Sequence, residues 1–166
     1  MGTVAAVVLA AGSATRFGSP KQRRFLPPVL DALRASLSIG QIVVVGGAYE
    51  LEADAHVVQC EDWELGPGAS LRCGLRALDA GAPAAVVVLA DGPSLDPHAV
   101  ERVVAAWQHG TGERLAATYD GVNRSHPVLL GRDAWSNVPD EGARALEVVL
   151  VPCADLVAPG DVDYDY

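Results

Sequence analysis

The chain has 166 residues, of which 50% are hydrophobic and 5% aromatic, and its formal net charge is −9 at pH 7. This length suits one ordinary domain with a sizeable core, and we expect residues 1–166 to form a single domain. The negative charge opposes binding to nucleic acid or to an anionic membrane surface, so we expect neither partner.

Strands and helices are predicted to alternate along the chain. Continuous apolar runs predict strands, at residues 4–9, 42–45, 55–59, 84–89, 115–119, 128–130 and 149–151. Helical spacing of apolar residues predicts helices between most of these runs. The first begins at Pro27 and Pro28, which suit a first helical turn, and ends before Gly40. The second is capped by Ser70 and closes at Gly81.

The second half of the chain continues this alternation. Asp96 is predicted to cap a helix that starts at Pro97, and residues 143–148 are predicted to form a short helix. Continuous apolar runs are typical of strands covered on both faces, and therefore of a mostly parallel sheet in a three-layer α/β fold. Ligands of such folds bind outside the carboxyl ends of the strands. We expect the loops after residues 9, 45 and 89 to meet at that edge.

The segment after the first predicted strand has the features of a phosphate-binding loop. It opens with the small residues Ala10, Ala11 and Gly12, which let the main chain turn tightly and bring N–H groups close to a ligand. Two cations follow, Arg16 and Lys21. A strand that ends in a flexible loop with two fixed positive charges suits a polyphosphate.

This loop differs from two common phosphate-binding motifs. The Walker motif has lysine directly after its second glycine, whereas Ser19 and Pro20 stand between Gly18 and Lys21. The dinucleotide fingerprint has a third glycine that residues 13–15 do not supply. Lys21 is the one lysine among the 12 lysine and arginine residues. Either this is chance, or the loop needs a compact point charge rather than the planar guanidinium of arginine.

Asp91 is the candidate metal ligand. It follows the strand predicted at residues 84–89 and is therefore expected on the same edge of the sheet as the cationic loop. Carboxylate oxygens suit Mg²⁺, which usually takes one or two of them together with substrate phosphates. We therefore expect Mg²⁺ as the cofactor, the alternative being a plain Asp-Gly-Pro turn.

The three cysteines, Cys60, Cys73 and Cys153, are far apart and include no C-x-x-C pair. They predict neither a zinc site nor a disulfide framework. The N-terminus lacks the basic start of a signal peptide, and no apolar run reaches the length of a membrane span. We expect a cytoplasmic protein.

The cationic loop resembles the signature of the nucleotidyltransferases with a Rossmann-like, glycosyltransferase-A-type fold. It is most similar to the MobA-like NTP transferases of the molybdenum-cofactor cytidylyltransferase branch. Their signature, L-A-A-G-x-x-x-R-x-G-x-x-K, is matched by Leu9, Ala10, Ala11, Gly12, Arg16, Gly18 and Lys21. The resemblance implies this three-layer fold, nucleotide binding by the small residues of the loop, and catalytic roles for its two cations. Ala11 stands where the guanylyltransferase branch usually has glycine, which favours CTP, with GTP as the alternative.

The segments that contain Ser70, His126 and Arg144 extend the resemblance. They imply that Gly68 and Ser70 approach the nucleotide and that His126 and Arg144 lie on the acceptor side. Asp91 corresponds to the metal-binding aspartate of the family. In that family a bulkier residue usually stands at the position of Gly92. Asp163 corresponds to a candidate second metal ligand, although the chain ends soon after it, and an acidic tail is the alternative.

The resemblance implies a Mg²⁺-dependent nucleotidyltransferase. It would transfer CMP from CTP to a phosphorylated acceptor such as molybdopterin, release pyrophosphate, and serve a molybdoenzyme of the xanthine dehydrogenase type. Two alternatives stay open. The acceptor could be a sugar phosphate or another phosphorylated metabolite, because acceptor contacts come from variable loops. The protein could also be a non-catalytic chaperone that binds the cofactor, which Gly92 and the short C-terminus would suit.

Overall fold

The computed structural model describes residues 3–10, 22–47 and 55–160. Within them, seven strands form one sheet in the order β3-β2-β1-β4-β6-β5-β7, and β6 alone runs antiparallel to its neighbours. The sheet is thus mostly parallel, as predicted. The strands are β1 (Val4–Leu9), β2 (Ile39–Gly46), β3 (His56–Gln59), β4 (Ala84–Leu89), β5 (Arg114–Thr118), β6 (Val128–Gly131) and β7 (Val149–Pro152).

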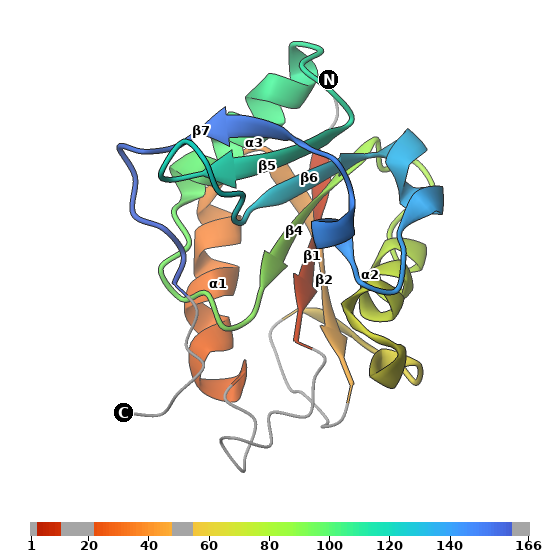
Figure 1. Cartoon of the computed structure of the whole chain (residues 1–166). Helices are drawn as coiled ribbons and strands as arrows, with labels where there is room; N and C mark the ends of the chain where they lie inside the picture. The colour runs from red at the N-terminus through yellow and green to blue at the C-terminus, as the bar shows by residue number, and fades with distance from the viewer. Residues whose placement is uncertain (1–2, 11–21, 48–54, 161–166) are drawn as a thin grey trace.

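Helices cover both faces of this sheet (Figure 1). The α-helices are α1 (Gln22–Ala35), α2 (Pro67–Arg76) and α3 (Pro97–Gln108), and the 3₁₀ turns are η2 (Trp63–Leu65), η3 (Arg132–Asn137) and η4 (Ala143–Ala145). Val4, Ala6 and Val8 of β1 belong to the core beneath α1 and α3, whereas Ala5 and Val7 belong to the core beneath α2. Successive side chains of a strand point to opposite faces, so burial on both faces explains why β1 is apolar at every position. The three-layer α/β prediction is confirmed.

The boundaries of two helices differ from the prediction. α1 begins at Gln22 and carries Pro27 and Pro28 inside it, on its exposed side. Leu26 is buried on the same helical face as Val29 and Leu33, and this burial extends the helix before the prolines. α1 ends at Ala35, and α2 starts after Gly66 and ends at Arg76. Ser70 is therefore a buried residue within α2 and not its cap.

Two further expectations are corrected and one is confirmed. Cys60, after β3, forms a disulfide with Cys73 of α2, against the prediction of none. The helix expected at residues 143–148 shrinks to η4. Asp96 does cap α3, because its carboxylate accepts a hydrogen bond of 2.8 Å from the backbone N–H of His98. No helix among the described residues is long and apolar enough to cross a bilayer.

α2 packs so closely on the sheet that it has no room for a side chain at Gly74. A Cβ atom there would lie 2.5 Å from Cγ1 of Val7 and 2.8 Å from Cγ2 of Val45. We predict that Gly74→Ala lowers the free energy of unfolding by about 2 kcal/mol, because overfilling a packed core forces side chains off their rotamers. Chemical denaturation measures the loss. Gly81→Ala is the matched control, because nothing lies within 4 Å of a Cβ at that position. Equal stability of the two variants would contradict this packing.

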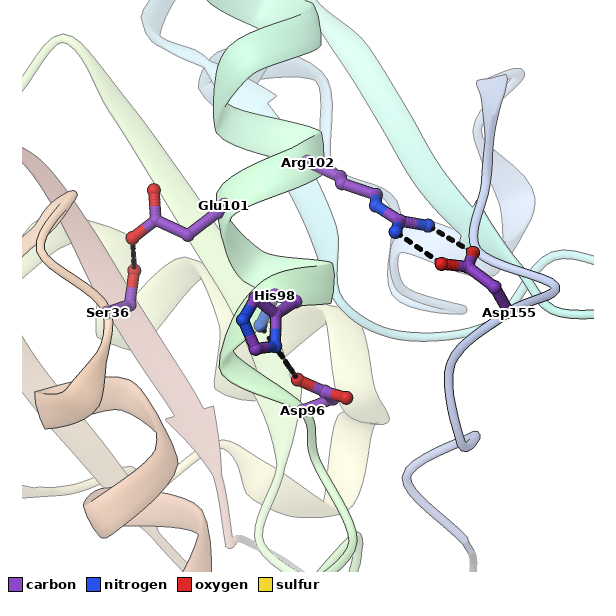
Figure 2. A network of polar contacts seen from close by, with 6 residues as sticks. All are labelled: Ser36, Asp96, His98, Glu101, Arg102 and Asp155. Atoms are coloured by element: carbon purple, nitrogen blue, oxygen red, sulfur yellow. Dashed lines mark hydrogen bonds and ion pairs between the residues drawn. The ribbon is translucent and has the colours of Figure 1, made fainter.

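Glu101 of α3 holds the connection between α1 and β2 (Figure 2). Its carboxylate accepts hydrogen bonds from the hydroxyls of Ser36, at 2.6 Å, and Ser38, at 2.5 Å. Burial alone would raise the pKa of Glu101, but these bonds outweigh it and lower the pKa from its ordinary value. A lowered carboxyl pKa stabilises the fold above its ordinary range, and this stabilisation is lost as the pH falls through the lowered value.

We predict that Ser36→Ala lowers the free energy of unfolding by about 1–2 kcal/mol at pH 7, since it removes a hydrogen bond to a charged group. The difference from the wild type should shrink as the pH falls below the range of carboxyl titration. Urea unfolding at several pH values checks this. Ser136→Ala, at an exposed serine, serves as control. A difference that stays constant with pH would refute the link to Glu101.

Candidate functional site

The carboxyl ends of the central strands meet at one edge of the sheet. Leu9, the last residue of β1, lies opposite Leu89 of β4 and Val45 of β2. The N–H of Ala10 donates to the carbonyl of Val45, at 2.9 Å, and the N–H of Ala90 donates to the carbonyl of Leu9, at 3.0 Å. Ala10 and Ala90, the first residues after β1 and β4, therefore leave the sheet at the same edge, as the sequence predicted.

A pocket of about 580 Å³ opens at this edge. Its floor is apolar and comes from the strand ends and α2, whereas charged residues come from the β5–β6 connection and the segment around η4. The lining residues are Leu9, Pro67, Leu71, Val87, Val88, Leu89, Gly92, Leu95, Arg124, Ser125, His126, Val128, Glu141, Gly142, Ala143, Arg144, Ala158, Pro159 and Gly160. A pocket with an apolar floor and a few polar groups is the usual form of a small-molecule site.

His126 lines this pocket, and the negative charge of Asp91 affects its pKa. Burial lowers the pKa of His126 below its ordinary value, and the negative charge of Asp91 opposes that shift. The imidazole is therefore neutral near pH 7 and can donate or accept a hydrogen bond. Asp91 also directly precedes Gly92, which lines the pocket.

The residues around Asp91 suit a metal that shares its coordination with a substrate. No group of three or more His, Cys, Asp or Glu side chains that could hold a metal occurs among residues 3–10, 22–47 and 55–160. A closed structural metal site is therefore not built from this part of the chain. Asp91, directly before the lining residue Gly92, offers a carboxylate beside the pocket, which fits a divalent cation that keeps waters and takes phosphate oxygens as further ligands.

The β5–β6 connection is held rigidly by Asp120. Its carboxylate accepts hydrogen bonds from the backbone N–H groups of Asn123, at 2.7 Å, and Val122, at 2.8 Å. These bonds hold the pKa of Asp120 well below its ordinary value, so the carboxylate stays charged and bound. The hydroxyl of Tyr119 donates to the carbonyl of His126 at 2.7 Å. This network fixes the end of the connection that carries the pocket residues.

Another wall of the pocket is held against α3. The guanidinium of Arg102 donates to both carboxylate oxygens of Asp155, each at 2.6 Å (Figure 2). This paired contact lowers the pKa of Asp155 to about 2. The N–H of Ser94 donates to the carbonyl of Pro159 at 2.9 Å. The chain after β7 is thereby led back to the turn that carries Asp91.

The packing of residues 158–160 explains why glycine follows Asp91. A Cβ at Gly92 would lie 3.1 Å from Cβ of Pro159 and 3.3 Å from the carbonyl oxygen of Gly160. A larger side chain at this position would push the wall outward. Gly92 is thus matched to the packing of residues 158–160, which close the pocket beside Asp91.

A model of the MobA-like NTP transferase domain matches residues 6–150. The chain belongs to this family. The matched range includes the loop signature and all of the pocket lining except residues 158–160, and it confirms the resemblance to the MobA-like NTP transferases. The MobA-like chain is accordingly a nucleotidyltransferase, which removes the non-catalytic chaperone from the alternatives.

Solved structures share the fold of this MobA-like chain. Rv0371c from Mycobacterium tuberculosis H37Rv is 25% identical with a TM-score of 0.77, and the match covers 99% of this chain and 94% of that one. A structure of Rv0371c in complex with manganese matches with 22% identity and a TM-score of 0.70, over 91% and 87% of the two chains. Molybdopterin-guanine dinucleotide biosynthesis protein A from Archaeoglobus fulgidus is 17% identical with a TM-score of 0.62, over 92% and 84%. No curated protein sequence matches significantly.

The structure brings together four of the site residues predicted for the MobA-like chain. Leu9, His126 and Arg144 line the pocket, and Asp91 directly precedes its lining residue Gly92. Ala10 leaves β1 at the same edge. The other predicted loop residues and the second metal ligand lie outside the described residues: Ala11, Gly12, Arg16, Gly18, Lys21 and Asp163.

Gly68 and Ser70 lie in α2, next to the pocket but not in its lining. The N–H of Gly68 donates to the carbonyl of Asp140 at 2.9 Å, and a Cβ there would lie only 1.6 Å from the carbonyl oxygen of Pro139. Ser70 is 3% exposed. In this structure Gly68 lets the segment before η4 approach α2, and the neighbouring Pro67 and Leu71 face the pocket.

Sequence reasoning missed Arg124, which lines the pocket and donates from Nη1 to the carbonyl of Ala143 at 3.1 Å. This bond joins the β5–β6 connection to η4, the turn that carries Arg144. The signal that could have found it is an arginine two residues before the His126-Pro127 pair.

Proposed function

We propose that this nucleotidyltransferase transfers CMP from CTP to a phosphorylated acceptor, with Mg²⁺ at Asp91, and releases pyrophosphate. The observation that carries the proposal is the meeting of Ala10 and Asp91 at one edge of the sheet, beside a pocket that also holds His126. A phosphate-binding loop and a carboxylate on that edge could contact the same triphosphate.

The loop after β1 would hold the nucleotide. Its residues Leu9, Ala10, Ala11, Gly12 and Gly18 would offer backbone N–H groups, with Gly68 and Ser70 supporting the nucleotide from α2. Arg16 and Lys21 would neutralise the β- and γ-phosphates, which leave as pyrophosphate. These assignments rest on the match between the loop and the family signature.

Asp91 would hold Mg²⁺, with Asp163 as a second ligand. When bound, the metal would supply positive charge to phosphate oxygens during the displacement. His126 and Arg144 would hold the acceptor on the other side of the pocket. The chain's own contribution is then to position two anions and balance their charge, without a covalent enzyme intermediate.

Ala11 supports CTP as the nucleotide, and a related fold supports the same choice. CMP:2-keto-3-deoxy-manno-octonic acid synthetase in complex with CTP matches with a TM-score of 0.67 and 9% identity, over 99% of this chain and 94% of that one. GTP is the alternative. The manganese complex of Rv0371c supports a divalent metal.

For the acceptor we propose molybdopterin, in a cytoplasmic pathway that supplies a molybdoenzyme of the xanthine dehydrogenase type. The family and the fold shared with the molybdopterin-guanine dinucleotide protein support it. A sugar phosphate or another phosphorylated metabolite is the second candidate, because the charged side of the pocket would accept any phosphate monoester.

The test is a panel of nucleoside triphosphates and acceptors, read by pyrophosphate release with Mg²⁺. Our proposal expects release with CTP and molybdopterin to exceed release with GTP or with sugar phosphates. Release with a sugar phosphate and not with molybdopterin would show that the proposed acceptor is wrong and that the proposed type of reaction is right. No pyrophosphate from any pair would overturn the proposed reaction.

A further inference from the structure

We propose that Arg124 selects the acceptor: together with Arg144 it forms a binding site for an oxyanion of the acceptor. The inference rests on the proposed function for the identity of the acceptor, and it concerns a residue that the family signature did not point to. The shared chemistry of the ligand is a phosphate or carboxylate group on an otherwise apolar body.

The position of Arg124 sets it on the acceptor side of the pocket. It lies two residues before His126, in the connection that leads into β6, whereas the proposed triphosphate loop leaves β1. Arg124 lines the same pocket as Gly92, which directly follows Asp91. An anion held by Arg124 would therefore approach Asp91 from the acceptor side.

The hydrogen bonds of Arg124 leave most of its guanidinium available. Nη1 donates to the carbonyl of Ala143 at 3.1 Å, which orients the planar group without neutralising it. Ala143 directly precedes Arg144, so the same bond brings the two arginines to one wall. A guanidinium offers five N–H donors in a fork that matches phosphate and carboxylate geometry.

The charges of Arg124 and Arg144 are not paired within the described part of the chain. Among residues 3–10, 22–47 and 55–160 neither arginine forms an ion pair, and both are exposed, as is their acidic neighbour in the lining, Glu141. The rest of the lining is largely apolar. An anion in the pocket would therefore find two guanidinium groups in the lining that no carboxylate of the described residues occupies.

The backbone on either side of Arg124 is also fixed before a ligand binds. Asp120 holds the tip of the connection through the N–H groups of Val122 and Asn123, and the N–H of Ser125 donates to the carbonyl of Ala117 at 2.7 Å. Arg124 lies between these fixed points. Little conformational entropy is lost when a ligand binds to side chains and backbone that are already ordered.

The first test titrates inorganic phosphate into the full chain by isothermal calorimetry, without nucleotide. We expect Arg124→Gln and Arg144→Gln each to weaken phosphate binding by about tenfold or more, as for the loss of a charge-assisted hydrogen bond. Arg124→Lys should recover part of the affinity, since it keeps the charge but loses the fork. Arg114→Gln is the control, because Arg114 is exposed and contacts the carbonyl of Glu147 away from this pocket.

Three outcomes would overturn the inference: no binding of either phosphate or acetate by the wild type, equal affinity in Arg124→Gln and the wild type, or affinity lost in Lys21→Ala but kept in Arg124→Gln. The last would place the phosphate at the triphosphate loop. Acetate in a parallel titration distinguishes a carboxylate from a phosphate as the preferred oxyanion, and binding of either supports the site.

Steady-state kinetics separate this inference from the proposed function. With the pair that turns over in the panel, Arg124→Gln should raise the KM of the acceptor at least about tenfold and leave the KM of the nucleotide within about twofold. An unchanged acceptor KM contradicts the role of Arg124 and leaves the reaction intact. If no pair releases pyrophosphate, the proposed reaction fails, and the phosphate titration still decides the role of Arg124.

Discussion

Asp91→Asn should lower the rate of pyrophosphate release by at least about 100-fold, the scale of losing one preorganised charge contact in a transition state. Asparagine keeps the size of aspartate and removes the negative charge that holds a divalent cation. Asp91 directly follows Ala90, whose N–H donates to the carbonyl of Leu9 at 3.0 Å, so the position is fixed by the sheet. The substitution is therefore expected to change the charge and to keep the backbone of this turn.

The Mg²⁺ dependence of the residual rate identifies the cause. If Asp91 holds the metal, the variant should need a higher Mg²⁺ concentration for half-maximal rate. Asp133→Asn is the matched control, because Asp133 is exposed and lines a different hollow, near Glu147 and Val149. A rate equal to the wild type in Asp91→Asn, or the same loss in Asp133→Asn, would exclude Asp91 as the metal ligand.

Reduction of the disulfide between Cys60 and Cys73 should lower the free energy of unfolding by about 3 kcal/mol. The two cysteines are 13 residues apart in the chain, and a crosslink over such a loop removes roughly this much conformational freedom from the unfolded state. The bond ties the segment after β3 to α2. Denaturation with and without a reductant measures the loss.

A Cys60→Ser/Cys73→Ser variant should have the stability of the reduced protein, and the reductant should not change it further. Cys153 provides an internal reference, since it is a buried free thiol. Thiol titration of the unfolded, unreduced wild type should therefore find one reactive cysteine. Three reactive cysteines, together with no effect of the reductant, would show that the bond does not form in solution.

The strands could be predicted because each central strand is buried on both faces and therefore has a continuous apolar run. β1 and β4 match their predicted bounds, residues 4–9 and 84–89. β3 was predicted one residue too early, since it begins at His56, an exposed residue at the edge of the sheet. Edge strands bury less side chain and therefore leave a weaker pattern.

The helix ends were harder to predict because local signals compete with tertiary packing. The prolines of α1 indicated a start at Pro27, but the burial of Leu26 beneath the helix places the start at Gln22. Ser70 is a good capping residue by type, yet α2 begins one turn earlier, at Pro67, where proline suits the first helical position. The packing that decides these ends joins residues far apart in the chain.

The site was predictable where a motif followed directly from a strand. Asp91 and Leu9 are placed by the ends of β4 and β1, so their common edge follows from the parallel sheet alone. Arg124 is placed by the fold of a connection, through Asp120 and Ala143, and no periodic pattern marks it. The disulfide likewise joins a loop to a helix, and the spacing of its cysteines did not show that they meet.

The central claim is that one divalent metal joins Asp91 to the triphosphate at the carboxyl edge of β1 and β4. A crystal structure with CTP and Mn²⁺, with the metal located by its anomalous scattering, tests this most directly. We expect Mn²⁺ at about 2.1–2.2 Å from a carboxylate oxygen of Asp91 and in contact with the α-phosphate, as for a hard octahedral cation. A metal bound to the triphosphate but remote from Asp91, or a nucleotide bound away from this edge, would contradict the account.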